Sequence, residues 1–147
     1  MNELRELYQE TILDHNRSPR HFGKLDCPSA QAEGHNPMCG DEITLYLKVR
    51  GNRIEEASFQ GCGCAISTAS ASMMTEAIIG RTIPEVESLF HSFQDRVTTG
   101  ADDGTDIGSL EALVGVREFP VRIKCATLAW HTLIAALKNQ NQKVSTE

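Results

Sequence analysis

The sequence predicts an α+β domain in which a small antiparallel β-sheet packs against helices. Three observations support this class. A helical apolar pattern opens the chain, two alternating segments joined by a Gly-Asn turn follow, and further helical patterns fill the second half. Consecutive strands joined by a tight turn pair antiparallel, whereas parallel strands need long crossovers. The 147 residues are the usual size of one domain, so we expect a single domain over residues 1–147.

The first half of the chain contains the expected first helix and the hairpin. Apolar residues at helical spacing predict a helix at about residues 3–15, which ends before a Ser-Pro pair. Residues 43–49 alternate between apolar and polar side chains, which is typical of a strand with one buried face. Gly51-Asn52 forms the turn, and residues 53–60 return as the partner strand. Because Ile54 is out of phase with that strand, we expect a bulge or a twisted start there.

The second half is expected to be helical. Residues 65–79 are rich in Ala, Ser and Met, carry one apolar helical face and end at a glycine. Residues 82–85 read Thr-Ile-Pro-Glu, a capping-box sequence that starts another helix. A loop rich in Gly and Asp covers residues 98–108, and a long helix starts near residues 119–120. The polar tail at residues 139–147 is expected to be frayed and flexible.

Composition and charge exclude several function classes. No apolar run approaches the roughly 18 residues that cross a membrane, so no membrane association is expected. Acidic residues outnumber basic ones by 20 to 14, and the formal charge of −6 argues against a nucleic-acid partner. The first residues lack the basic start and apolar stretch of a secretory signal, so we expect a cytoplasmic protein. In that reducing compartment, the five cysteines are expected to serve metal binding or redox chemistry rather than disulfides.

Cys39, Asp41 and Cys125 are candidate metal ligands. A glycine separates Cys39 from Asp41, which gives the backbone freedom to turn the thiolate and the carboxylate toward one centre. Cys125 lies near the start of the last helix and follows Arg122 and Lys124, whose positive charges would favour its thiolate. A buried core cysteine is the alternative for Cys125, because the apolar stripe of the helix passes through this position.

The remaining thiols differ in their local chemistry. Cys62 and Cys64 flank a glycine before a helix whose N-terminal dipole stabilises a thiolate. Local chemistry alone does not choose between the two, although Cys64 lies nearer to the helix amides and is therefore favoured as the ligand. Cys27 has no neighbouring ligand and is expected to be an ordinary cysteine. The histidines are expected at the surface or at caps, although His35 lies close enough to Cys39 to support a ligand. Tetrahedral zinc accepts three thiolates and one carboxylate, here Cys39, Asp41, Cys64 and Cys125, which must converge through the fold.

Three segments that carry these cysteines resemble the IscU/NifU-type family of iron–sulfur cluster assembly proteins. They are residues 36–41 (NPMCGD), 63–72 (GCAISTASAS) and 119–128 (FPVRIKCATL). The similarity continues through residues 108–116 and covers nearly the whole chain. The resemblance implies an α+β fold of the SufE/NifU (IscU-like) type, with a small antiparallel sheet backed by helices. It also implies a metal site at one end of the fold, made of Cys39, Asp41, Cys64 and Cys125.

Two features make the chain most similar to the SufU branch of that family. Lys124 stands where IscU scaffolds carry a histidine beside the last cysteine, and the acidic segment 101–106 resembles the insertion that distinguishes SufU proteins. A calcium-binding EF-hand loop is excluded for this segment, because its sixth and twelfth positions are Ile107 and Leu113 instead of glycine and glutamate. Cys62 is unusual for the family, and a spare thiol, a resolving partner and an alternative ligand are the readings left open for it.

The resemblance implies a zinc-dependent sulfurtransferase of iron–sulfur cluster biogenesis. Cys39 would accept persulfide sulfur from a SufS-type cysteine desulfurase, for use by downstream iron–sulfur assembly proteins, and Arg122 would orient the partner or the thiolate. On this hypothesis, a desulfurase residue displaces Cys39 from zinc and frees it to attack. One alternative is a scaffold that assembles and transfers a transient [2Fe-2S] cluster on the same residues. The other is a structural zinc site that only supports folding.

Overall fold

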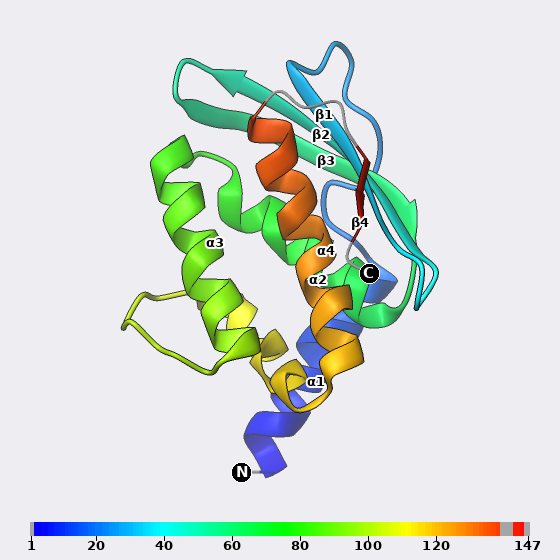
Figure 1. Cartoon of the computed structure of the whole chain (residues 1–147), viewed down its shortest axis with the longest axis vertical. Helices are drawn as coiled ribbons and strands as arrows, with labels where there is room; N and C mark the ends of the chain where they lie inside the picture. The colour runs from blue at the N-terminus through cyan, green and yellow to red at the C-terminus, as the bar shows by residue number, and fades with distance from the viewer. Residues whose placement is uncertain (1, 139–142, 146–147) are drawn as a thin grey trace.

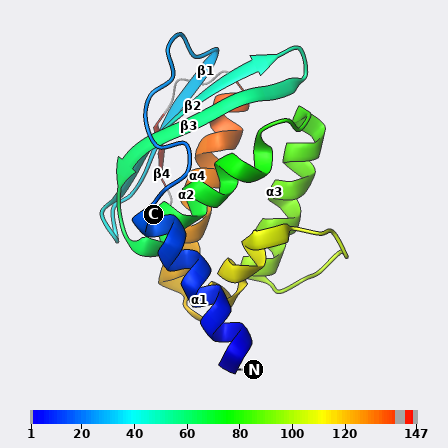
Figure 2. The same cartoon turned by 180° about the vertical axis from the view of Figure 1, so that it is seen from behind.

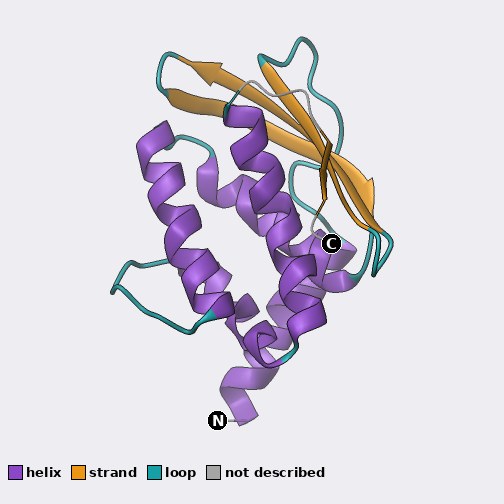
Figure 3. Cartoon of the chain, viewed as in Figure 1, coloured by secondary structure: helices purple, strands orange, loops and turns teal. Residues whose placement is uncertain are grey.

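The protein has two layers, a four-stranded β-sheet and a set of helices that packs on one of its faces (Figure 1, Figure 3). The structure is a computed structural model that describes residues 2–138 and 143–145. The predicted α+β class is confirmed. In chain order the elements are α1 (Asn2–Arg17), β1 (Ala30–Asn36), β2 (Asp41–Arg50), β3 (Arg53–Cys62), α2 (Ala65–Ile78), α3 (Ile83–Thr98), the 3₁₀ helix η1 (Gly108–Glu118), α4 (Pro120–Leu137) and β4 (Lys143–Ser145).

The sheet is built around β2 and β3, which form the predicted antiparallel hairpin. Their register shifts between Lys48 and Val49, and Val49 pairs with the out-of-phase Ile54, so the predicted irregularity is confirmed. β1, which the sequence pattern did not predict, pairs antiparallel with β2. β4 then pairs in parallel with β1, in the order β3-β2-β1-β4. Within the tail expected at 139–147, residues 143–145 therefore form a strand, and the others lie outside the described residues.

The helices follow the predicted pattern with one addition. α1, α2 and α4 lie where apolar periodicity predicts them. α3 begins with the predicted capping box, in which the Thr82 N–H donates to Glu85 Oε1 at 2.9 Å and the Glu85 N–H donates to the Thr82 hydroxyl at 3.4 Å. The addition is η1, whose buried Leu110 and Leu113 are three residues apart and share one face of a 3₁₀ helix. Among the helices of residues 2–138, none is long and apolar enough to cross a membrane.

The core lies between the sheet and the helices α2 and α4. Leu45 and Leu47 of β2 and Phe59 of β3 are almost fully buried. α4 lies directly against β1, because a Cβ atom at Gly34 would come within 2.1 Å of Thr132 Oγ1. This packing brings the start of α4 beside the turn that joins β1 to β2, and the end of β3 pairs with the start of β2 next to that turn. Three segments that are far apart in sequence therefore meet at one end of the sheet.

α1 packs against α2 (Figure 2), and a buried hydrogen-bond cluster joins the two helices. His15 is only 5% exposed, so the expectation of a surface histidine is wrong for this residue. Its Nδ1 lies 2.7 Å from the Ser72 hydroxyl, which also accepts the Arg20 backbone N–H at 2.8 Å. Its Nε2 lies 3.6 Å from Glu76. Burial, followed by the charge of Arg20, lowers the pKa of His15, so the folded state favours the neutral imidazole.

Candidate metal centre

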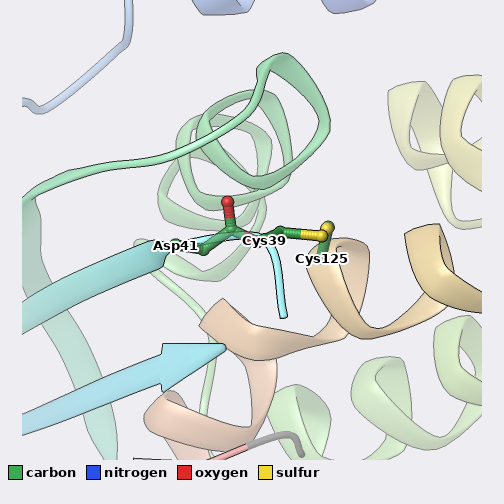
Figure 4. A group of neighbouring side chains, drawn as sticks. All are labelled: Cys39, Asp41 and Cys125. Carbon is green, nitrogen blue, oxygen red and sulfur yellow. The ribbon is translucent and has the colours of Figure 1, made fainter. Parts of the chain in front are cut away.

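Three of the four predicted ligand residues come together at one end of the sheet (Figure 4). One sulfur or carboxylate oxygen from each of Cys39, Asp41 and Cys125 lies within 4.8 Å of the other two. Asp41 and Cys125 are fully buried, whereas Cys39 is only partly buried. The group therefore combines two inaccessible donors with one donor that a partner molecule can reach.

The turn between β1 and β2 positions Cys39 and Asp41. The Cys39 N–H donates to the Asn36 carbonyl at 3.3 Å, and Gly40 has a φ of +70°, in the left-handed region that favours glycine. The turn reverses the chain so that Asp41 starts β2 directly opposite Asn36. Because side chains alternate along a strand, Asp41 shares the helix-covered face of the sheet with the buried Ile43.

The segment between β3 and α2 approaches the Asp41 carboxylate. The Cys64 N–H donates to Asp41 Oδ1 at 2.9 Å. This approach requires glycine at position 63, because a Cβ atom there would lie 2.5 Å from Asp41 Oδ1 and 3.2 Å from the Asp41 Cα. Cys64 is also the N-cap residue of α2, where the helix dipole favours an anion. Its sulfur does not belong to the 4.8 Å group, yet its charge acts on Cys125.

The electrostatics of the group centre on Cys125. Burial, followed by hydrogen bonds with Asp41 and Cys39, raises the pKa of the Cys125 thiol far above its usual range. Arg122 lies one turn earlier on α4. Its interaction with the Cys125 side chain, followed by the charge of Cys64, raises the pKa of Arg122. Arg122 is thus the predicted supporting cation that interacts with the group, whereas no hydrogen bond or ion pair of the described residues links Lys124 to it.

Cys62 and His35 face away from the ligand group. Cys62 is exposed and pairs with Glu42 across β2 and β3, and His35 pairs with the same Glu42 across β1 and β2. Because neighbouring residues of a strand point to opposite faces, this row faces away from Asp41. A pocket of about 430 Å³ borders the row, and the described residues that line it include His35 and Glu42 but none of the predicted ligands. Cys27 is exposed in the loop before β1.

Asn36 contacts the ligand group and was missed by reasoning from sequence. Its side chain is fully buried, and its Nδ2 lies 3.3 Å from Asp41 Oδ2 and 3.6 Å from Cys125 Sγ. An Asn-Pro pair is typical of a turn, so the turn alone explained the presence of Asn36 in the sequence and gave no reason to expect contact with a ligand. No sequence signal could have found this contact, because Asn36 faces Asp41 only through the pairing of β2 with β1, a strand that the sequence pattern did not predict.

The residues of the group fit a zinc ion. Zinc lies about 2.3 Å from thiolate sulfur and about 2.0–2.2 Å from carboxylate oxygen, so neighbouring ligands of one tetrahedral ion are roughly 3.6–3.8 Å apart. Donor atoms that already lie within 4.8 Å of one another need only small movements to reach that geometry. The bare Gly63, whose Cβ would collide with the Asp41 carboxylate, keeps space beside this donor. The structure therefore provides a candidate metal site at Cys39, Asp41 and Cys125.

The fold and the site together define an α+β domain with a candidate metal centre of thiol and carboxylate groups at one end of its sheet. Of the three donors, Asp41 and Cys125 are fully buried, and only Cys39 is partly accessible. The chain belongs to the NifU-like N terminal domain family, whose model matches residues 7–147.

Relatives of known description cover most of the chain. It is 47% identical over 131 residues to the zinc-dependent sulfurtransferase SufU of Bacillus subtilis (strain 168), which covers 88% of each chain. It is 42% identical over 139 residues to the iron–sulfur cluster assembly scaffold protein IscU of Streptococcus pyogenes serotype M1, covering 94% of this chain and 87% of that one. A crystal structure from Fervidobacterium islandicum AW-1, described as a scaffold protein for the SUF system, has a TM-score of 0.84 at 36% identity and covers 87% of this chain and 94% of that one.

Proposed function

We propose that this chain is an iron–sulfur cluster assembly protein that acts as a zinc-dependent sulfurtransferase. The observation that carries the proposal is the convergence of Cys39, Asp41 and Cys125, of which Cys39 alone is accessible. The 47% identity to a zinc-dependent sulfurtransferase supports the same function here. Cys64 is the proposed fourth ligand, because its N–H binds Asp41 and its charge acts on Cys125. We place the protein in the cytoplasm, where reducing conditions keep its cysteines free.

Cys39 is the proposed sulfur acceptor. Its thiolate attacks the outer sulfur of a persulfide carried by a SufS-type cysteine desulfurase. The S–S bond of that persulfide breaks, the desulfurase cysteine leaves as a thiolate with the bonding electron pair, and Cys39 becomes a persulfide. The transferred sulfur keeps its oxidation state, so the exchange needs no oxidant or reductant. The Cys39 persulfide is then available to downstream iron–sulfur assembly proteins.

The other residues of the site hold its shape during this exchange. Zinc, when bound, would order the donors and offset their negative charge in a buried site. The Asp41 carboxylate receives an N–H on each oxygen, one from Cys64 and one from Asn36, which keeps it oriented. Arg122, whose pKa responds to Cys125, Cys64 and Cys39, supplies a positive charge near these cysteines. The site therefore keeps its anionic donors in place while Cys39 reacts.

The two segments that carry Cys39 and Cys125 also carry three exposed apolar side chains, which form an apolar rim. Met38, Phe119 and Val121 are 64%, 60% and 47% exposed, although large apolar side chains gain free energy from burial. Met38 precedes Cys39 in its turn, and the other two flank the start of α4. Apolar side chains clustered beside a functional group are typical of protein–protein contact. We propose that the desulfurase docks on this rim, with its persulfide over Cys39 and Arg122 at the edge of the contact.

Mass spectrometry of the intact protein tests the sulfur transfer. The protein is incubated anaerobically with a SufS-type desulfurase and cysteine, and we expect the wild type to gain sulfur that reductant removes. Cys39→Ser should gain none, whereas Cys62→Ser, a matched control on the other face of the sheet, should behave as the wild type. Zinc content is measured in each variant, so that loss of the metal is distinguished from loss of the acceptor. Normal sulfur uptake by Cys39→Ser would contradict the proposal.

A [2Fe-2S] scaffold is the second candidate function. The same thiolate and carboxylate donors suit such a cluster, and the chain is 42% identical to a scaffold protein. Native mass spectrometry after addition of ferrous iron separates the two candidates. Zinc retained with sulfur on Cys39 would favour sulfur transfer, and zinc replaced by a stable [2Fe-2S] unit would favour the scaffold. A structural zinc site predicts a third outcome, in which removing zinc unfolds the chain and the desulfurase adds no sulfur.

A further inference from the structure

We propose that Asn36 is a positioning residue of the metal centre, and that its side-chain amide joins Asp41 to Cys125. The inference rests on the proposed function, because it concerns the zinc ligands named there. Asn36 is the last residue of β1, is fully buried, and has an amide nitrogen 3.3 Å from Asp41 Oδ2 and 3.6 Å from Cys125 Sγ. An amide nitrogen carries two hydrogens, one for each of these acceptors. Asn36 thus connects a donor on β2 to a donor on α4.

The orientation of the Asn36 amide follows from the charge of its neighbours. With the amide turned over, its Oδ1 would face the Asp41 carboxylate and the Cys125 sulfur, two groups that carry or gain negative charge on binding a metal. In the observed orientation, Asn36 Oδ1 has no hydrogen-bond partner among the described residues, although it is buried. Leaving a buried acceptor unpaired is unfavourable. The amide adopts this orientation because it directs both of its N–H groups at ligand atoms.

The two hydrogen bonds have separate effects on a bound metal. The bond to Asp41 Oδ2 complements the 2.9 Å bond from the Cys64 N–H to Oδ1, so each carboxylate oxygen is held by one donor. The bond to Cys125 Sγ withdraws negative charge from the sulfur and makes it a weaker electron donor to the metal. Removing the amide should therefore weaken metal binding through the loss of its hold on Asp41, and it should make Cys125 a stronger electron donor to the metal. A residue that only shaped the turn would do neither.

Two substitutions separate the hydrogen bonds of Asn36 from its shape. Asn36→Asp keeps the size of the side chain but replaces both N–H groups by an anion beside Asp41, and Asn36→Ala removes the group without adding charge. The matched controls are Asn52→Asp and Asn52→Ala, in the exposed turn between β2 and β3. Circular dichroism of the zinc-free proteins establishes that each variant folds. If Asn36→Ala proves unfolded, the isosteric Asn36→Asp still answers the question.

The zinc affinity of each protein is measured by competition with a chromophoric chelator at constant pH. We expect Asn36→Ala to bind zinc about 10–100-fold more weakly than the wild type, with the Asn52 variants unchanged. The carboxylate of Asn36→Asp also attracts zinc, so the cobalt spectrum is the readout for that variant. In the cobalt-substituted proteins, loss of the N–H to sulfur bond should shift the sulfur-to-cobalt charge-transfer band to longer wavelength. Wild-type affinity and an unchanged cobalt spectrum in folded Asn36 variants would overturn the inference. A wild type that binds no zinc would instead overturn the metal centre, and this inference with it.

Discussion

Replacing Gly63 by alanine tests how closely the segment between β3 and α2 approaches Asp41. The new Cβ atom would lie 2.5 Å from Asp41 Oδ1 and 3.2 Å from the Asp41 Cα and Cβ, and contacts below 3.0 Å essentially do not occur for real Cβ atoms. Asp41 is fully buried, and its backbone is paired with β1 and lies at the start of β2. Since Asp41 cannot turn away, the segment that carries Cys64 must move.

The expected losses of stability and of zinc affinity follow from what this movement disturbs, which is the packing around Asp41 and the Cys64–Asp41 hydrogen bond. Overpacking of a buried site costs about 1–3 kcal/mol, and the free energy of unfolding of the metal-free Gly63→Ala protein should fall by that amount. For a domain of this size, about 1 kcal/mol corresponds to roughly 2–4 °C, so the melting temperature should fall by about 2–12 °C. Displacing Cys64 also breaks or lengthens its 2.9 Å hydrogen bond to Asp41. We therefore expect zinc affinity to fall by about 10–100-fold.

Urea unfolding of the metal-free protein and chelator competition for zinc measure these two effects. Gly115→Ala is the matched control, because a Cβ atom at Gly115 meets no atom within 4 Å and this glycine does not have a positive φ. That control should be neutral or more stable by up to about 1 kcal/mol, since alanine reduces the freedom of the unfolded chain. If Gly63→Ala matched Gly115→Ala in both stability and zinc affinity, the close approach to Asp41 would be refuted.

Two further predictions concern buried polar groups outside the metal centre. Burial holds the pKa of His15 below its usual 6.5, so its contribution to stability is present above pH 6.5 and is lost as pH falls below that value. Between pH 7.5 and pH 5.5, urea unfolding should therefore show a smaller loss of stability in His15→Gln than in the wild type, and equal losses would contradict the assignment. Arg96 is 5% exposed, pairs with Asp102 at 2.8 Å and with Glu111, and donates to the Thr105 carbonyl. Arg96→Met should lower the free energy of unfolding by only about 1–2 kcal/mol, because water can solvate the two partly exposed partner carboxylates once the arginine is gone. Limited proteolysis should then cut the 101–107 loop faster than in the wild type, and unchanged cleavage would count against this anchoring role.

The parts of the fold that depend on local pattern could be predicted from the sequence. The β2–β3 hairpin, the irregularity at Ile54 and the capping box of α3 each depend on residues that are close in the chain. β1 could not be predicted, because its sequence AQAEGHN has no β-branched or aromatic residue and places only Ala and Gly, which are poor strand formers, between its polar residues. It becomes a strand because β2 offers an unpaired edge and because Gly34 lets α4 pack against it. Both causes are tertiary and leave no local pattern.

The candidate site shows the same division between local and tertiary information. Residue chemistry was enough to predict Cys39, Asp41 and Cys125, which the structure brings together. It could not choose between Cys62 and Cys64. Strand pairing separates them, because Cys62 pairs with the outward-facing Glu42 whereas the Cys64 N–H reaches the Asp41 carboxylate. The bond between Asn36 and Cys125 joins residues 89 positions apart, and only the packing of α4 on β1 creates it.

The three converging donors differ in how the protein holds them, and the difference bears on the proposed function. Asp41 on β2 and Cys125 on α4 are both buried, and the Asn36 amide connects their side chains. Cys39 lies in a turn beside Gly40, is only partly buried, and has the backbone bond to Asn36 as its tether. A sulfur acceptor must move toward its partner while the rest of the site keeps its shape. Departure of the Cys39 side chain leaves the connection between Asp41, Asn36 and Cys125 intact, so Cys39 is the donor that can be released without dismantling the site.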